Sequence, residues 1–251
     1  MPDELRHEDS RRPGINASLA IFLRSDIFYK IIRIAREPDK IRFHKLTWAD
    51  PELLLRVIEE RYAASREENV DPKHFWKTFF CPSVKSEATA NYFVQRILAR
   101  PRDLLFFVRA AVDTAVNRGH SRVEEQDVLD AEKQYSQYAF ESILVENGYS
   151  LTTLENLLIE FAGSKSILTE NELKEIVQSV IRPKEVDGMI QHLCTLTFLG
   201  VEINDNDFRF TDDPEELKKN LILGKKVAEG RGSSGRFRIS PPFRAYLETR
   251  E

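Results

Sequence analysis

Apolar residues recur every three or four positions in a series of segments, which is the pattern of amphipathic helices. Pro51 lies near the start of the first such segment, and Ser86 is expected to cap the second. Thr169, with Glu172 three residues later, has the spacing of a capping box. The expected helices are 48–64, 87–100, 103–117, 124–144, 151–161, 170–180 and 184–199, with a short aromatic segment at 74–80. This pattern predicts a mainly α protein, with four linked helices of the first half forming a small bundle.

The last hundred residues add short strands to helices. Residues 201–204 and 208–211 alternate around Asp205-Asn206-Asp207, which predicts a hairpin. Three helices followed by a hairpin is the order of a winged-helix domain. Residues 215–223 are expected to be helical, 225–235 to be a flexible basic loop, and 237–240 to be a final strand.

A different pattern comes near the start of the chain, where residues 19–23 are all apolar. The run ends at Arg24-Ser25-Asp26 and is as long as one strand. Apolar residues at every position are typical of a strand buried on both faces, as in a parallel sheet. Because one strand cannot make a sheet, we expect partner strands from a segment that precedes it.

Composition places the chain among globular proteins of one or two domains. Its 251 residues are 41% hydrophobic and include 10 Gly and 2 Cys, which excludes a disordered chain, a collagen and a disulfide scaffold. No apolar run has the length of a membrane span, and the charged first fourteen residues lack the core of a secretory signal. We therefore expect a cytoplasmic protein with no membrane partner.

Charge is unevenly distributed along the chain. Residues 1–149 carry −1, residues 150–217 carry −9 and residues 218–251 carry +6, which sum to the net charge of −4. A basic tail can contact an anionic partner, although a solvated basic loop is the alternative. The candidates for nucleic-acid binding are Lys218, Lys219, Lys225, Lys226, Arg231, Arg236 and Arg238.

No catalytic motif is present, and the strongest local signal is an arginine at a helix start. The sequence has no phosphate loop, dinucleotide fingerprint, nucleophile elbow or zinc motif. Arg102 stands in the first turn of the expected helix 103–117, where an anion rather than a cation is favoured. A phosphate would suit both the arginine and the backbone N–H groups. The alternative is that Arg102 forms an ion pair with Asp103 or another carboxylate. Arg24 is a second candidate for binding an anion, and its alternative is an ion pair with Asp26 or another carboxylate.

The order of several blocks resembles the C-terminal half of bacterial P-loop ATPases of the AAA+, KAP and STAND types, including origin-recognition-like members. The blocks are IFLRSDIF, ELLLRVIEERY, FWKTFF, YFVQRILARPRDLLFFVRAAVDTAVNRGH and VEEQDVLDAEKQYS. The resemblance implies one leftover strand of a P-loop α/β core in residues 1–46, a helical lid in 47–148 and a winged-helix domain in 149–251.

The same resemblance implies roles for individual residues. Arg102 would be the second sensor arginine, which reaches the γ-phosphate of ATP, while Arg24 and Asp26 would lie near the end of the first sensor strand. Arg61 would be structural or would face a neighbouring subunit.

The departure from these ATPases lies before residue 17. The phosphate-loop lysine and the acidic strand that holds Mg²⁺ should precede it, so this chain is not expected to hydrolyse ATP alone. ATP and Mg²⁺ would be bound only with a P-loop half from the same or a separate chain. The chain would then sense ATP and transmit hydrolysis to a DNA or protein partner, and a homo-oligomer is a further candidate. The alternative is a winged-helix DNA-binding or protein-interaction module with no nucleotide role.

Overall fold

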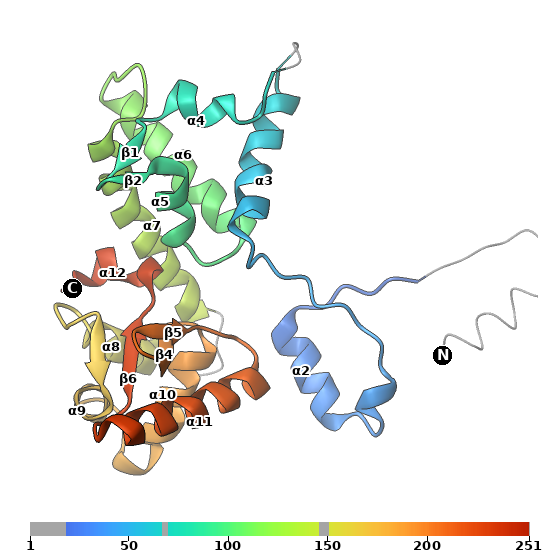
Figure 1. Ribbon diagram of the computed structural model, residues 1–251, viewed down its shortest axis with the longest axis vertical. Coiled ribbons are helices and arrows are strands. Elements are labelled where there is room, and N and C mark those ends of the chain that lie inside the picture. Colours follow the sequence, from blue (N-terminus) through green and yellow to red (C-terminus); the bar gives the residue numbers. More distant parts are fainter. Residues whose placement is uncertain (1–18, 67–69, 146–150, 251) are drawn as a thin grey trace, which may run out of the picture. The chain divides into compact units, whose positions relative to one another are not determined.

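The computed structural model describes residues 19–66, 70–145 and 151–250, in two units, Met1–Leu46 and Thr47–Glu251. Each unit is described by itself. The described part is mainly α-helical with two small antiparallel sheets, which confirms the predicted fold class at that level (Figure 1). None of the helices in these ranges is both long and apolar enough to span a bilayer.

The first unit contains the helix α2 (Ser25–Ile34) and a 3-10 helix, η1 (Pro38–Lys40). The predicted strand at 19–23 is wrong, because residues 19–24 have no regular structure and Ile21 and Phe22 are 71% and 82% exposed. A strand needs a neighbour for its backbone N–H and C=O groups, and the described part of this unit contains no other strand. Arg24 consequently precedes a helix as its N-cap rather than ending a strand.

The helical bundle of the second unit begins after Trp48. Its elements are α3 (Pro51–Ala64), α4 (His74–Phe79), β1 (Ser83–Val84), β2 (Glu87–Ala88), α5 (Thr89–Gln95), α6 (Pro101–Asn117) and α7 (Glu125–Val145). The long helices α6 and α7 run antiparallel and pack along their length (Figure 1). At the centre, the Phe107 ring stacks on Tyr135 at 5.4 Å and meets Phe93 edge-on at 4.5 Å.

Helix positions in the bundle follow the apolar pattern, but one predicted cap is wrong. Ser86 caps no helix: it lies with φ +66° in the tight turn between β1 and β2. The helix that follows starts only at Thr89, ends at Gln95 and has no side-chain cap. The predicted stop of α7 at Asn147-Gly148 lies outside the described residues.

The remainder of the second unit combines helices with a four-stranded antiparallel sheet. Its elements are α8 (Leu151–Ile159), β3 (Ile167–Thr169), α9 (Glu170–Gln178), the 3-10 helix η2 (Pro183–Glu185), α10 (Val186–Thr195), β4 (Leu199–Asn204), β5 (Asp207–Arg209), α11 (Pro214–Arg231), β6 (Arg236–Ile239) and α12 (Pro241–Leu247). The strand order is β3-β6-β4-β5, so β6 enters between two earlier strands. The predicted hairpin, final strand and capping box at Thr169 are all confirmed.

Two predicted boundaries in this part are wrong. The helix expected to reach residue 199 ends at Thr195, because Leu199 already pairs with Ile239 in the sheet. Where a basic loop was expected at 225–235, helix α11 continues to Arg231. A Cβ on Gly224 would lie 2.7 Å from the Glu202 carbonyl oxygen, so this glycine lets the helix approach β4 closely.

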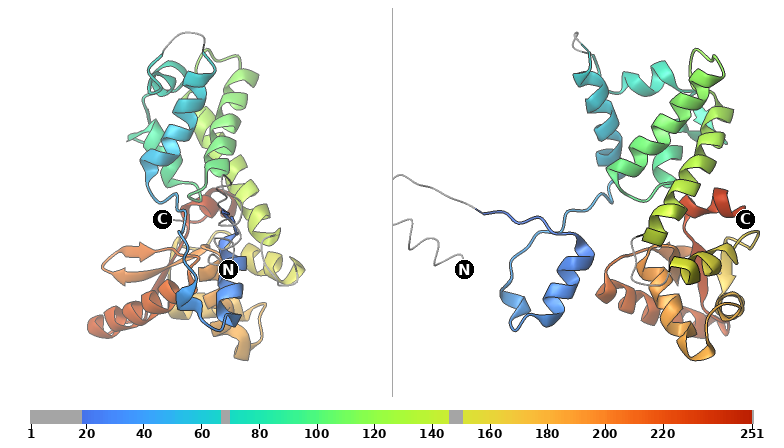
Figure 2. Two further views of the ribbon diagram at one scale, coloured as in Figure 1. Left: turned by 90° about the vertical axis from the view of Figure 1, so that its right-hand side faces the viewer. Right: turned by 180° about the vertical axis from the view of Figure 1, so that it is seen from behind.

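Helix α12 joins the sheet-containing part to the bundle. It packs against α7, as Figure 2 shows from two further sides. The Tyr246 N–H donates to Ser136 Oγ at 2.9 Å, and the Tyr246 ring lies 5.0 Å from the ring of Phe140. The bundle and the sheet therefore share one continuous core.

Candidate functional site

The start of α6 holds the arginine that the sequence singles out. Arg102 lies in the first turn, and its Nε is 3.5 Å from Asp103 Oδ2. The Arg102 side chain is 56% exposed, whereas Asp103 is 2% exposed. The ion pair that the sequence leaves as the alternative is therefore present, and about half of the arginine still faces solvent.

Asp103 fixes this helix start to α7. It accepts a hydrogen bond from the Tyr135 hydroxyl at 3.0 Å, and the same hydroxyl accepts the Leu98 N–H at 2.9 Å. Burial raises the pKa of Asp103, while the Tyr135 hydrogen bond and the charges of Arg100 and Arg102 oppose the rise. Asp103 thus acts as a structural anchor beneath the exposed Arg102 and the partly buried Arg100.

Within the second unit, Arg61 and Arg102 lie at different ends of their helices. Helices α3 and α6 both begin at the same end of the bundle (Figure 1), and Arg61 is in the last turn of α3 whereas Arg102 is in the first turn of α6. Arg24, the N-cap of α2, and Asp26, in its first turn, belong to the first unit, and the Asp26 side chain is outside the described part.

Two of the predicted nucleic-acid residues are held in an ion-pair network around Glu202 on β4. Arg231 Nη1 and Arg236 Nε each donate to Glu202 Oε2 at 2.8 Å, and Arg231 also pairs with Asp205 at 3.0 Å. Burial acts to raise the pKa of Glu202, but the two arginines outweigh it and bring the pKa to about 2. Their positive charge is therefore largely neutralised within the protein.

The other candidates for nucleic-acid binding lie in two places, on α11 and on β6. Lys218, Lys219, Lys225 and Lys226 are exposed on α11, in two pairs seven residues apart and so on similar sides of the helix. Arg238 lies elsewhere, on β6, with its guanidinium 5.7 Å from the centre of the Phe208 ring. Its Nε is buried without a hydrogen-bond partner.

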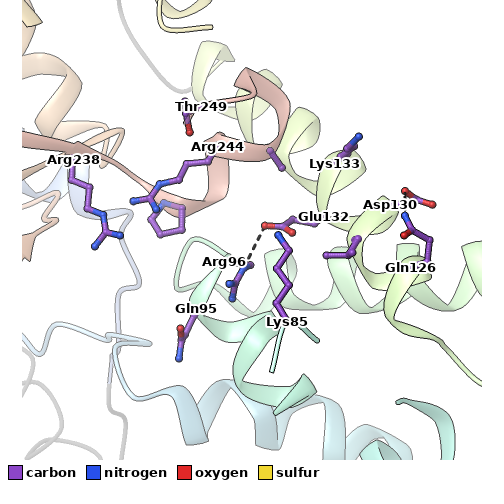
Figure 3. Close-up of a pocket in the computed structure, with 13 residues that line it drawn as sticks. Lys85, Gln95, Arg96, Gln126, Asp130, Glu132, Lys133, Arg238, Arg244 and Thr249 are labelled. Carbon is purple, nitrogen blue, oxygen red and sulfur yellow. Dashed lines mark hydrogen bonds and ion pairs between the residues drawn. The ribbon is translucent and has the colours of Figure 1, made fainter. Parts of the chain in front are cut away.

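Arg238 lines a groove of about 830 Å³ between the bundle and the sheet-containing part. One wall comes from the β1–β2 turn, the end of α5 and one face of α7, and the other from β6 and α12. Figure 3 shows Lys85, Arg96, Arg238 and Arg244 directed toward the same space, with Lys133 at its edge.

The groove is rich in cations. Lys85, Arg96, Lys133, Arg238 and Arg244 line it, against the two carboxylates Asp130 and Glu132. Both carboxylates are already paired: Asp130 with Arg118, and Glu132 with Arg96 at 3.4 Å. Of these cations, the sequence patterns identify only Arg238 as a candidate for binding nucleic acid. The others come from separate elements that meet only in the fold.

The described ranges contain no cluster of three or more His, Cys, Asp or Glu side chains that could hold a metal ion.

Comparison with known proteins gives one match. Residues 52–144 match the family model described as the FunZ-associated C-terminal helical domain. The matched stretch corresponds to the bundle from α3 to α7 and is less than half of the chain. No curated protein and no solved structure matches the chain.

Proposed function

We propose that this chain is the lid and winged-helix part of a P-loop ATPase, which senses bound ATP and transmits hydrolysis to a DNA or protein partner. The observation that carries the proposal is the exposed apolar run at 19–23. Leu19, Ile21 and Phe22 are each more than two-thirds exposed, which is costly in water. Contact with a further domain or chain, such as a P-loop half, would cover these side chains.

The order of elements after α7 supports the winged-helix part of the proposal. Strand β3 follows α8, helices α9 and α10 come next, and β4 and β6 complete a three-stranded core in the order β3-β6-β4. The segment between β4 and β6, where a wing would lie, holds β5 and the long helix α11.

The contact between α12 and α7 supports transmission. Because Tyr246 bonds Ser136 and packs on Phe140, a rotation of the bundle would carry the sheet-containing part with it. This contact supplies the mechanical link that a lid needs in order to act on a distant partner.

Arg102 is the residue of this chain that we assign to ATP. Its half-exposed guanidinium suits a phosphate oxygen, and its ion pair with Asp103 would orient it. ATP supplies the phosphoryl group for hydrolysis when bound, and we assign the phosphate loop and the Mg²⁺ ligands to the P-loop half.

The test uses the native assembly that contains this chain, with ATP and Mg²⁺. Arg102→Ala should lower the rate of ATP hydrolysis at least tenfold, while the purified chain stays folded with a somewhat lower unfolding midpoint, because Asp103 loses its ion pair. Arg109→Ala is the matched control, since Arg109 lies seven residues further along the same helix and, among the described residues, pairs with the exposed Asp113 alone. Equal hydrolysis rates for the two variants would show that Arg102 has no sensing role.

Nucleic-acid binding without a nucleotide role is the second candidate. The four exposed lysines of α11 favour it, whereas Asp187 on α10 and Asp205 at the hairpin tip would repel phosphate. A Lys218→Gln/Lys219→Gln/Lys225→Gln/Lys226→Gln variant should bind a DNA duplex more weakly and with a shallower salt dependence. Unchanged affinity would exclude this surface.

A further inference from the structure

We infer that the groove between the bundle and the sheet-containing part binds the sugar-phosphate backbone of a nucleic acid. This inference stands apart from the ATPase proposal and does not need the lysines of α11. Two observations support it. The groove holds more cations than carboxylates, and both carboxylates already form ion pairs with arginines.

The charge surplus is not cancelled from within the protein. Both groove carboxylates are paired, Asp130 with Arg118 outside the groove and Glu132 with Arg96. Within the described ranges, no carboxylate lies at ion-pair distance from Lys85, Lys133 or Arg238. An anionic ligand would therefore compensate the charges of Lys85 and Arg238, together with part of the charge of Lys133, which also acts on the Asp130 carboxylate.

Arg238 gives the strongest structural support for an anionic ligand in the groove. Its Nε is covered and makes no hydrogen bond, a state that costs free energy for a charged donor group. The guanidinium keeps its place through the Phe208 ring beneath it, and Figure 3 shows it facing the groove. A phosphate oxygen at the guanidinium would offset the cost of the uncompensated charge.

The lining also indicates which part of a nucleic acid would bind. No aromatic side chain lines the groove, so bases would have no surface on which to stack. Gln95, Gln126 and Thr249 supply neutral donors of the kind that contact phosphate oxygens and sugars. Cations from both walls suit a chain of phosphates better than a single one, and recognition would not depend on base sequence.

The test measures fluorescence anisotropy of a labelled 20-base-pair duplex of random sequence with the full 251-residue chain. Lys85→Gln/Lys133→Gln should raise Kd roughly tenfold or more at 100 mM salt, and the slope of log affinity against log salt should be shallower by about 2. Both side chains are exposed, so the variant should fold normally. Lys73→Gln/Lys77→Gln, which removes two exposed lysines outside the groove, should bind like the unmodified chain.

Each other outcome overturns the inference in a distinct way. Unchanged affinity in the groove variant, with loss in the α11 variant, would place the nucleic acid on α11 instead. No binding by the unmodified chain at 50 mM salt would exclude both surfaces, while leaving the ATP test of Arg102 untouched. Displacement of the duplex by poly-glutamate as readily as by unlabelled duplex would identify an acidic protein segment as the ligand.

Discussion

Residues 19–46 and residues 47–251 use similar apolar side chains in opposite ways. In the first unit Leu19, Ile21, Phe22 and Ile34 are exposed, whereas the second unit buries a continuous core from Leu54 to Leu247. The difference lies in available partners rather than in residue type. Amphipathic helices in the bundle pack on each other within one chain, whereas none of the described residues of the first unit belongs to the buried core.

The largest expected change in stability comes from removing a buried side chain in the bundle, which would leave a cavity. Phe107→Ala should lower the free energy of unfolding by about 3–5 kcal/mol, because Phe107 is fully buried between Phe93 and Tyr135. Urea unfolding followed by circular dichroism measures it. Its neighbour Phe106, 36% exposed, is the control, and Phe106→Ala should cost clearly less. Equal losses would mean that packing at this site is not what stabilises the bundle.

The next effect concerns the buried ion-pair network of the sheet. Glu202→Gln should lower the free energy of unfolding by about 2–3 kcal/mol at pH 7, since it leaves Arg231 and Arg236 without their carboxylate. The folded-state pKa of about 2 lies below the ordinary 4.5. The carboxylate therefore stabilises the fold above about pH 4.5, and this contribution is lost as the pH falls toward 2.

Unfolding of the Glu202→Gln variant between pH 2 and 5 provides the check on that mechanism. The variant should lose part of the pH dependence of the unmodified chain in this range, whereas Glu229→Gln, which alters an exposed acid on α11, should keep it. An identical pH profile for all three proteins would contradict the assigned role of Glu202.

A smaller effect is expected at the start of α9. Thr169→Ala removes the acceptor for the Glu172 N–H and should cost about 1 kcal/mol. Ser86→Ala is the matched change, because Ser86 lies in a turn and caps no helix. Thermal unfolding should show a larger fall in the unfolding midpoint for Thr169→Ala than for Ser86→Ala. The opposite order would mean that Thr169 does not stabilise α9 as its cap.

The smallest expected change in stability is at Phe22 in the first unit, and a large change there would contradict the contrast between the two units. Phe22→Ser should change the free energy of unfolding of the chain by less than about 0.5 kcal/mol, because Phe22 is 82% exposed. A loss above about 1 kcal/mol in urea unfolding would mean that Phe22 is buried in solution. The proposed function predicts, in addition, that the same substitution weakens association with a P-loop half in the native assembly.

Sequence patterns located the elements that depend on local signals. The capping box at Thr169 and the apolar spacing of α6 each lie within one segment, and both were predictable. The strand at 19–23 was mispredicted because strand formation depends on partners that the segment itself does not specify. Residues 225–235 suggested a flexible basic loop, whereas the close packing of Gly224 on β4 accompanies a helix that continues to Arg231.

The candidate sites were less predictable than the fold. The Arg102–Asp103 pair could be foreseen because the residues are adjacent. The pairing of Glu202 with Arg231 and Arg236 joins residues 29 and 34 positions apart, across strands and a helix. The groove gathers Lys85 and Arg238 from opposite ends of the second unit, so only the folded chain shows their shared charge.

The docking of α12 on α7 has a consequence for how the protein is made. Ser136 and Tyr246 are 110 residues apart. At about 5–20 residues per second, a ribosome needs roughly 6–20 s to synthesise the stretch between them. During that interval the bundle has emerged but the surface of α7 around Phe140 has no helix to cover it. A nascent chain thus presents a transient apolar binding face that a chaperone could occupy until α12 arrives.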